Sequence, residues 1–196
     1  MMNWKLKDVL MMGIISVLFG VIYLGCTFAG GILSGILTPL GLSALGYEPF
    51  YGIYFMAGAF GVYVMRKPGA GIISEILAAV IECLLGNYFG PIIILSGLIQ
   101  GLGIELLIAV FRYKNFSYKI MILSSIICSV LTLGYNMVVS GYSAIAAPVL
   151  LLMLVVRIIS AIIFSGILTK SLSDRLAKAG VLRSYAIAKD STVVTE

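Results

Sequence analysis

The sequence predicts an all-α membrane protein with six transmembrane helices and with both termini in the cytoplasm. Two observations predict this class. Apolar residues make up 61% of the 196 residues and the mean hydropathy is +1.15, whereas a soluble domain is nearer ~45–50% apolar. Twelve of the thirteen Lys and Arg residues stand in four short groups that alternate with long apolar runs. Basic residues are retained on the cytoplasmic side of a membrane, so this alternation predicts six crossings.

The four basic groups also predict which connections face which side. The groups are Lys5 and Lys7; Arg66 and Lys67; Arg112, Lys114 and Lys119; and Lys170, Arg175, Lys178, Arg183 and Lys189. The connections 30–50, 86–91 and 140–148 contain no Lys or Arg, and we expect them outside the cell. The net charge of +5 lies on loops and tail, which indicates contact with anionic lipid headgroups rather than with nucleic acid.

A helix needs ~20 apolar residues to cross ~30 Å of hydrocarbon, and this length sets the expected crossings. They are 8–28, 50–65, 70–86, 91–111, 118–139 and 148–169. The first apolar run is longer than the ~7–15 residues of a signal-peptide core, so we interpret it as a retained helix. The segment 30–49 is apolar but interrupted by Gly and Pro. It predicts an outer loop or short half-helix after the first crossing, partly covered by protein.

The later crossings are bounded by the basic groups and by short Gly- and Pro-containing turns. The second is short and ends at Arg66, and the third ends at Gly86. The fourth begins after Pro91, the fifth follows the third basic group, and the sixth begins at Pro148. Together these crossings form one substrate-binding domain over residues 1–170.

The segment 171–185 differs in character from the crossings. Leu172, Leu176 and Ala179 recur at helical spacing, with charged residues elsewhere on the surface. This pattern predicts a short amphipathic helix on the cytoplasmic surface that ends near Gly180. We expect a disordered tail at 191–196, so that residues 171–196 form a cytoplasmic extension of the transmembrane domain.

Composition excludes several classes of function. There is no histidine, which excludes Ser-His-Asp and Cys-His catalysis. The three cysteines lie inside apolar segments and are expected to be small core residues rather than metal ligands. No phosphate-binding glycine loop is present, so any ATP hydrolysis that drives transport belongs to another chain. We therefore expect no enzyme activity, no metal and no cofactor.

Ionisable residues inside the apolar segments are costly and become functional candidates. Glu75 and Glu82 are seven residues apart on one helical face, and Arg157 stands in the middle of the last crossing. We expect Arg157 to pair with Glu75 or Glu82, and Arg157–Glu75 is the preferred structural ion pair.

A second group of polar and aromatic residues clusters near the predicted outer side. A carboxylate, amide side chains and aromatic faces together suit a small, flat, nitrogen-rich and cationic ligand, although any one tyrosine is more usually an interface residue. The candidate ligand-binding residues are Glu82, Glu48, Asn87, Tyr88, Gln100, Asn136, Tyr135, Tyr47, Tyr51 and Tyr142.

Small residues share one face of the first crossing. Gly13, Ser16 and Gly20 recur there and would let another helix approach closely. This face either packs inside the chain or docks a separate membrane subunit. We assign these three residues to docking.

One stretch of the chain carries a family resemblance. It runs from Tyr51-Gly52-Ile53-Tyr54-Phe55-Met56-Ala57-Gly58 through Arg66-Lys67-Pro68-Gly69-Ala70-Gly71 to Glu75 and Glu82. It resembles the YkoE family, an S component of energy-coupling factor (ECF) transporters for thiamin or hydroxymethylpyrimidine. The resemblance implies a transmembrane coupling subunit, cytoplasmic ABC-type ATPases and an S component that topples in the membrane. Other thiamin-binding S components place a tryptophan in the pocket, but the single Trp here is Trp4, so stacking falls to Tyr or Phe.

The sequence therefore predicts a protein of the bacterial cell membrane that captures thiamin from the outside for ATP-driven uptake by partner subunits. Hydroxymethylpyrimidine as the principal substrate is the alternative within this class. The alternative from another class is a proton- or cation-coupled carrier or channel that uses Glu75, Glu82, Glu105 and Arg157 as a relay. An intramembrane enzyme is disfavoured because the residues supply no nucleophile–base pair.

Overall fold

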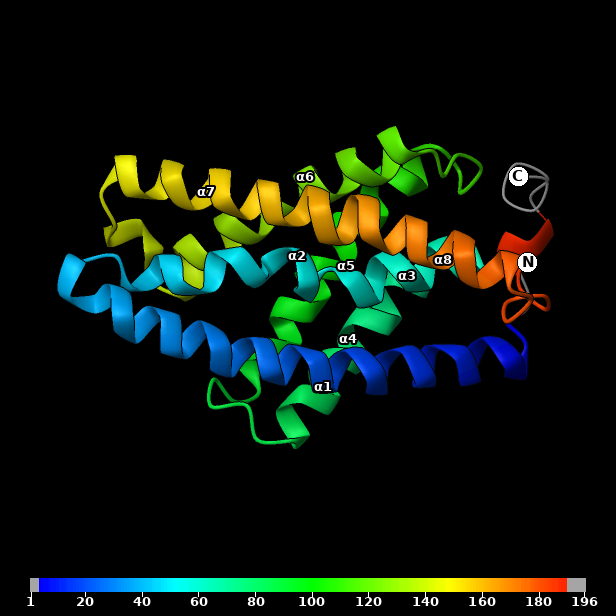
Figure 1. Cartoon of the computed structure of the whole chain (residues 1–196), viewed down its shortest axis with the longest axis horizontal. Helices are drawn as coiled ribbons and strands as arrows, with labels where there is room; N and C mark the ends of the chain where they lie inside the picture. Colours follow the sequence, from blue (N-terminus) through cyan, green and yellow to red (C-terminus); the bar gives the residue numbers. More distant parts are fainter. Residues whose placement is uncertain (1–3, 190–196) are drawn as a thin grey trace.

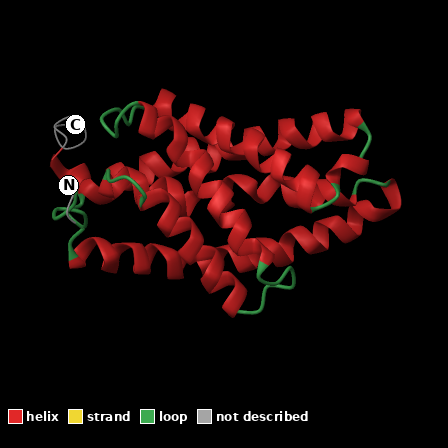
Figure 2. Ribbon diagram, turned by 180° about the vertical axis from the view of Figure 1, so that it is seen from behind, coloured by secondary structure: helices red, strands yellow, loops and turns green. Residues whose placement is uncertain are grey.

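Two long helical rods run along the length of the bundle in the computed structural model, which describes residues 4–189 (Figure 1). One rod is α1 (Leu6–Leu37). The other is α7 (Ala147–Ala161), which continues through the π-helical segment Ile162–Leu168 into α8 (Thr169–Lys178). Residues 4–189 contain no strand (Figure 2). The prediction of an all-α protein is confirmed for this part of the chain.

Four stretches of the described chain are long and apolar enough to cross a bilayer. They are Leu6–Leu40, Ile92–Val110, Tyr118–Val139 and Ala147–Lys178. The predicted second and third crossings correspond to shorter helices: α2 (Tyr51–Tyr54) and α3 (Met56–Met65) for the second, and α4 (Ala70–Leu84) for the third. α5 (Ile92–Val110) and α6 (Tyr118–Val139) match the predicted fourth and fifth crossings closely. Six complete crossings remain a prediction.

The first helix continues well past its predicted end at residue 28. Gly30, Gly31 and Gly35 lie inside α1, where a glycine costs only about 1 kcal/mol relative to alanine. Gly30 also has a packing role, because a Cβ there would clash with the Tyr47 ring. The helix gives way to a 3-10 turn at Thr38–Leu40, followed by Gly41 at φ 69°. The expectation of a loop from residue 30 is therefore wrong for the part up to Leu37.

The chain then folds back as a 3-10 helix, η2 (Ser43–Phe50), against the end of α1. The approach is so close that a Cβ on Gly46 would meet the backbone of Ser34. Of the two forms predicted for this segment, the short half-helix describes it. The consequence is that Tyr47 and Glu48 are carried back onto the bundle.

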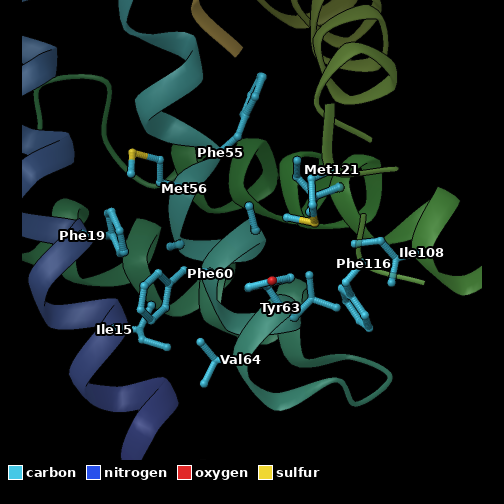
Figure 3. Close-up of a cluster of buried hydrophobic side chains, with 14 of the residues drawn as sticks. Ile15, Phe19, Phe55, Met56, Phe60, Tyr63, Val64, Ile108, Phe116 and Met121 are labelled. Atoms are coloured by element: carbon cyan, nitrogen blue, oxygen red, sulfur yellow. The ribbon is translucent and has the colours of Figure 1, made fainter. Parts of the chain in front are cut away.

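α3 is the central helix. All ten of its residues are buried, which agrees with a sequence that is apolar on every face. The predicted single helix 50–65 is broken at Phe55, which is fully buried between α2 and α3. Phe60 packs towards Phe19 of α1, and Tyr63 towards Phe116 beyond α5 (Figure 3).

No break separates the predicted sixth crossing from the predicted surface helix. The helical rod runs unbroken from Ala147 to Lys178, and a turn with Gly180 at φ 82° follows. Tyr63 of α3 accepts a hydrogen bond from Lys170 Nζ at 2.6 Å and donates one to Asp174 at 2.5 Å, so α8 is fastened to the core helix. The tail expected at 191–196 lies outside the described residues.

The basic groups of the sequence gather at one end of the bundle. Lys67 Nζ lies 2.5 Å from Asp8 Oδ2, and the Tyr185 hydroxyl donates to the backbone carbonyl of Lys7 at 3.0 Å. The Arg66 guanidinium lies 4.8 Å from the Phe116 ring centroid. These contacts bring together the start of α1, the α3–α4 and α5–α6 connections, and the turn after α8, which we call the basic end.

Candidate ligand-binding cavity

A cavity of about 510 Å³ lies among α1, α2, η2 and α4–α6. The residues that line it include Tyr47, Phe89 and Tyr142. These residues come from the three connections that contain no Lys or Arg. All three connections that the sequence predicts outside the cell thus contribute to the lining of the cavity.

Eight of the ten predicted ligand-binding residues line this cavity. They are Glu82, Asn87, Gln100, Asn136, Tyr135, Tyr47, Tyr51 and Tyr142. Glu48 and Tyr88 do not line it. These two residues lie behind the lining and support it, as described below.

Glu82 projects from the last turns of α4 and is 4% exposed. Its Oε1 accepts hydrogen bonds from Thr27 Oγ1, at 2.7 Å, and from the Asn87 amide. The Thr27 hydroxyl is also 3.0 Å from the Tyr54 hydroxyl. Within residues 4–189, no Lys or Arg forms an ion pair with Glu82. The cavity therefore contains a carboxylate that is hydrogen-bonded but lacks a cationic partner.

A second carboxylate, Glu75, lies behind the residues that line the cavity. It accepts hydrogen bonds from the Tyr23 hydroxyl at 2.8 Å and from the Gly58 amide at 2.5 Å. When the Gln100 amide oxygen accepts from Ser96, the amide nitrogen donates to Glu75 at 3.2 Å. Glu75 thus fixes the orientation of a side chain that does line the cavity.

Arg157 pairs with Glu48, so the predicted pairing with Glu75 is wrong. Its Nε lies 2.6 Å and its Nη2 2.7 Å from the two carboxylate oxygens of Glu48, and both side chains are fully buried. Nη1 donates to Thr132 at 3.2 Å. The sequence interpretation treated Glu48 as part of an outer loop, whereas the fold-back of η2 carries it to the middle of α7.

The Arg157–Glu48 pair supports one wall of the cavity. The guanidinium lies 3.5 Å from the centroid of the Tyr51 ring, and the Tyr51 hydroxyl accepts from the Asn136 amide. Tyr51 and Asn136 both line the cavity. The buried pair therefore positions this wall, where an aromatic ring and an amide face the ligand space.

Tyr88 supports Tyr47, which lines the cavity. Its hydroxyl lies 2.7 Å from that of Tyr47 and donates to the backbone carbonyl of Thr27 at 2.9 Å. The Tyr47 ring also meets the Phe89 ring edge-on, with centroids 5.5 Å apart. These contacts link η2 to the 86–91 connection beside the cavity.

The sequence interpretation missed three contributors to the site: Tyr23, Thr27 and Tyr54. Tyr23 and Thr27 are four residues apart on the face of α1 that meets α4. Tyr54 follows Tyr51 by three residues on the same short helix. The helical spacing of polar side chains within apolar runs was the signal that could have revealed them.

The small-residue face of α1 is mainly internal. The Ser16 hydroxyl donates to the Ser74 carbonyl at 3.1 Å, and a Cβ on Gly20 would clash with Ile81 of α4. The docking role expected for Ser16 and Gly20 is therefore wrong, because both are buried against α4. Gly13 faces open space and stays a candidate for contact with another subunit.

Comparisons with known proteins identify the family. A family model described as "ABC-type cobalt transport system, permease component" matches residues 7–131. That description names cobalt, whereas the described residues contain no group of three or more His, Cys, Asp or Glu that is placed to hold a metal ion. The YkoE protein of Bacillus subtilis (strain 168), named provisionally as an HMP/thiamine permease protein, is 43% identical over 190 residues, which are 97% of this chain and 93% of that protein.

A solved structure gives the same result for the fold. The crystal structure of an S-component of an ECF transporter superposes with a TM-score of 0.89 at 43% identity, covering 95% of this chain and 92% of that one. These relatives are membrane transport proteins, so the chain is a multi-pass protein of the cell membrane and not an enzyme. With such identity over nearly its whole length, the chain belongs to the YkoE family of ECF-transporter S components.

Proposed function

We propose that this S component captures thiamin from outside the cell and that partner subunits use ATP to drive its uptake. The observation that carries the proposal is Glu82, a cavity-lining carboxylate with no Lys or Arg partner within residues 4–189. A buried carboxylate without a countercharge is costly. A ligand that brings its own positive charge, as the thiazolium of thiamin does, would supply the missing partner.

The remaining lining residues suit the other half of such a ligand. Asn87, Gln100 and Asn136 offer amide groups, and Tyr47, Tyr51 and Tyr142 offer rings and hydroxyls around the same space. A volume of about 510 Å³ falls within the ~300–1,000 Å³ typical of small-molecule sites. An aminopyrimidine can donate and accept hydrogen bonds with these amides while it packs against a ring.

The sidedness of the proposal follows from the charge distribution. The basic end collects lysines and arginines from four separated parts of the chain, and such residues are retained in the cytoplasm. In this orientation both termini are cytoplasmic and the cavity faces outward. The partners would be a transmembrane coupling subunit and cytoplasmic ATPases, with Gly13 and the exposed face of α1 available for contact.

Labelling of single introduced cysteines tests this orientation. Ser143, which follows the cavity-lining Tyr142, and Asn115 at the basic end are both exposed. A membrane-impermeant maleimide should label Ser143→Cys in intact cells and Asn115→Cys only after permeabilisation, with the wild-type chain giving the background from its three native cysteines. The reverse pattern would turn the cavity inward and end the proposal.

The second candidate substrate is hydroxymethylpyrimidine (HMP), because the Bacillus subtilis relative is named for HMP as well as for thiamine. This pyrimidine carries no thiazolium and so would leave Glu82 without a countercharge. We expect purified protein to bind thiamin at least about tenfold more tightly, which corresponds to about 1.4 kcal/mol. Competition calorimetry, with mass spectrometry of the ligand that copurifies, measures this preference. Equal or tighter binding of hydroxymethylpyrimidine would make it the substrate.

A further inference from the structure

A second, smaller cavity lies at the basic end, far from the residues that line the first. Its volume is about 180 Å³, and it is formed by the start of α1, the end of α3 with the α3–α4 connection, and the segment after α8 that ends in the 3-10 helix η5 (Ala186–Lys189). The charged side chains that line it are Lys5, Lys7, Asp8, Lys67 and Lys189. Four cations and one anion give this small space a formal charge of +3 (4 − 1).

Part of this charge is fixed in place by the protein. Lys67 pairs with Asp8 at 2.5 Å. Lys7 donates to the Ser184 carbonyl and lies 5.6 Å from the Tyr185 ring centroid. Lys5 and Lys189 form no ion pair with any residue in the range 4–189. Within residues 4–189, two of the lysines thus contact the walls of the cavity, and the other two have no anionic partner.

The surroundings of this cavity indicate where that anion comes from. The first turns of α1 expose Leu6 and Leu10 to 76% and 58%, as expected of side chains solvated by lipid tails. Trp4 is 39% exposed, and Lys67 Nζ lies 5.5 Å from the centroid of its ring. Tryptophan beside lysine is typical of the membrane–water interface. The cavity therefore lies where the headgroups of the adjacent leaflet would be.

We propose that this cavity binds the phosphate group of an anionic phospholipid. Lys5 and Lys189 would contact the phosphate, Lys7 and Lys67 would add to the positive field, and the acyl chains would lie along the exposed leucines of α1. Basic pockets next to membrane helices recognise anionic headgroups in this way. Because the site joins the start of the chain to the turn after α8, an occupied site would tie the two ends of the described chain together.

Lipid retention by the full-length protein tests the proposal. The probes are phosphatidylglycerol and phosphatidylcholine with identical acyl chains, titrated onto detergent-purified protein and counted by native mass spectrometry. The test variant is Lys5→Gln/Lys189→Gln. The matched control, Lys114→Gln/Lys119→Gln, removes two exposed lysines that are also at the basic end but do not line the cavity.

We expect the wild type to prefer phosphatidylglycerol, and the test variant to lose at least about tenfold in its affinity while the control changes little. Circular dichroism and size-exclusion profiles establish that both variants are folded. Should the double variant fail to fold, the single variant Lys189→Gln, altered at an exposed side chain, is expected to show a smaller loss in the same direction.

Three results would overturn the proposal. Equal losses in the two variants would mean that the basic end attracts anionic lipid only diffusely. Saturation by inorganic phosphate without any preference for phosphatidylglycerol would assign the site to a soluble anion. Capture of an acidic peptide, with no lipid retained, would assign it to a protein partner.

Discussion

Replacing Glu82 with glutamine should weaken thiamin binding by at least about tenfold, or about 1.4 kcal/mol. The substitution preserves the size of the side chain and removes its charge. It leaves an oxygen to accept from Thr27, which now lies 2.7 Å from the carboxylate, so the cavity should keep its shape. What is lost is the charge that would pair with the thiazolium. Isothermal titration of the purified variant measures the change.

The matched control for this experiment is Glu105→Gln. Glu105 is also a buried carboxylate without a Lys or Arg partner in the described residues. It accepts from the amides of Gly69 and Ile72 and from the Tyr113 hydroxyl, and it does not line the cavity. We expect it to affect stability and to leave affinity within about twofold. If Glu82→Gln binds thiamin as tightly as the wild type, the carboxylate is not the partner of the cation.

Replacing Arg157 with methionine should lower the free energy of unfolding by about 3–5 kcal/mol, because it leaves the Glu48 carboxylate buried without its countercharge. Both side chains are fully buried, and the two nitrogen–oxygen distances of 2.6 and 2.7 Å indicate a bidentate pair. Arg157→Lys should recover only part of the loss, since an ammonium cannot reproduce the planar two-point contact. Thermal and denaturant unfolding in detergent measures both variants.

The double variant Arg157→Met/Glu48→Gln separates the pair from its surroundings. It should be more stable than Arg157→Met alone, because the uncompensated charge has been removed. Simple addition of the two single effects would show that the residues are not coupled. We also expect the single Arg157 variant to lose thiamin affinity, since Tyr51 rests on the guanidinium.

The sequence was sufficient to predict which ends of the helices gather polar residues. The lysine-free connections and the polar positions of the later helices pointed to the cavity, and Glu82, Asn87, Gln100 and Asn136 all line it. These four residues meet at one cavity because the ends of a helix fix the approximate depth of each of its residues along the bundle. Depth alone narrows the set of residues that can meet in a short, membrane-sized bundle.

The sequence could not predict which residues at one depth are neighbours. Judged by depth or charge alone, Arg157 had three possible ion-pair partners: Glu75, Glu82 and Glu48. The position of η2 determines which carboxylate pairs with Arg157. η2 packs against α1 because Gly30 leaves room for the Tyr47 ring and Gly46 leaves room for the backbone of Ser34. Close approach of two segments is a tertiary property that a glycine-rich stretch permits but does not specify.

The same limit explains the misassigned face of α1. Small residues at Ser16 and Gly20 indicate a close neighbour, and the pattern is identical whether that neighbour is α4 of the same chain or a helix of another protein. Only the position of Ile81 and Ser74 against this face distinguishes the two.

The complete burial of α3 has a consequence for biosynthesis. Its ten residues would rise about 15 Å, roughly half the thickness of the hydrocarbon layer, and none of them faces outward. In the folded bundle α3 is covered by α1, α4, α5 and α8 instead of by acyl chains. Three of these helices follow α3 in the sequence, so α3 can complete its native packing only after they have been synthesised.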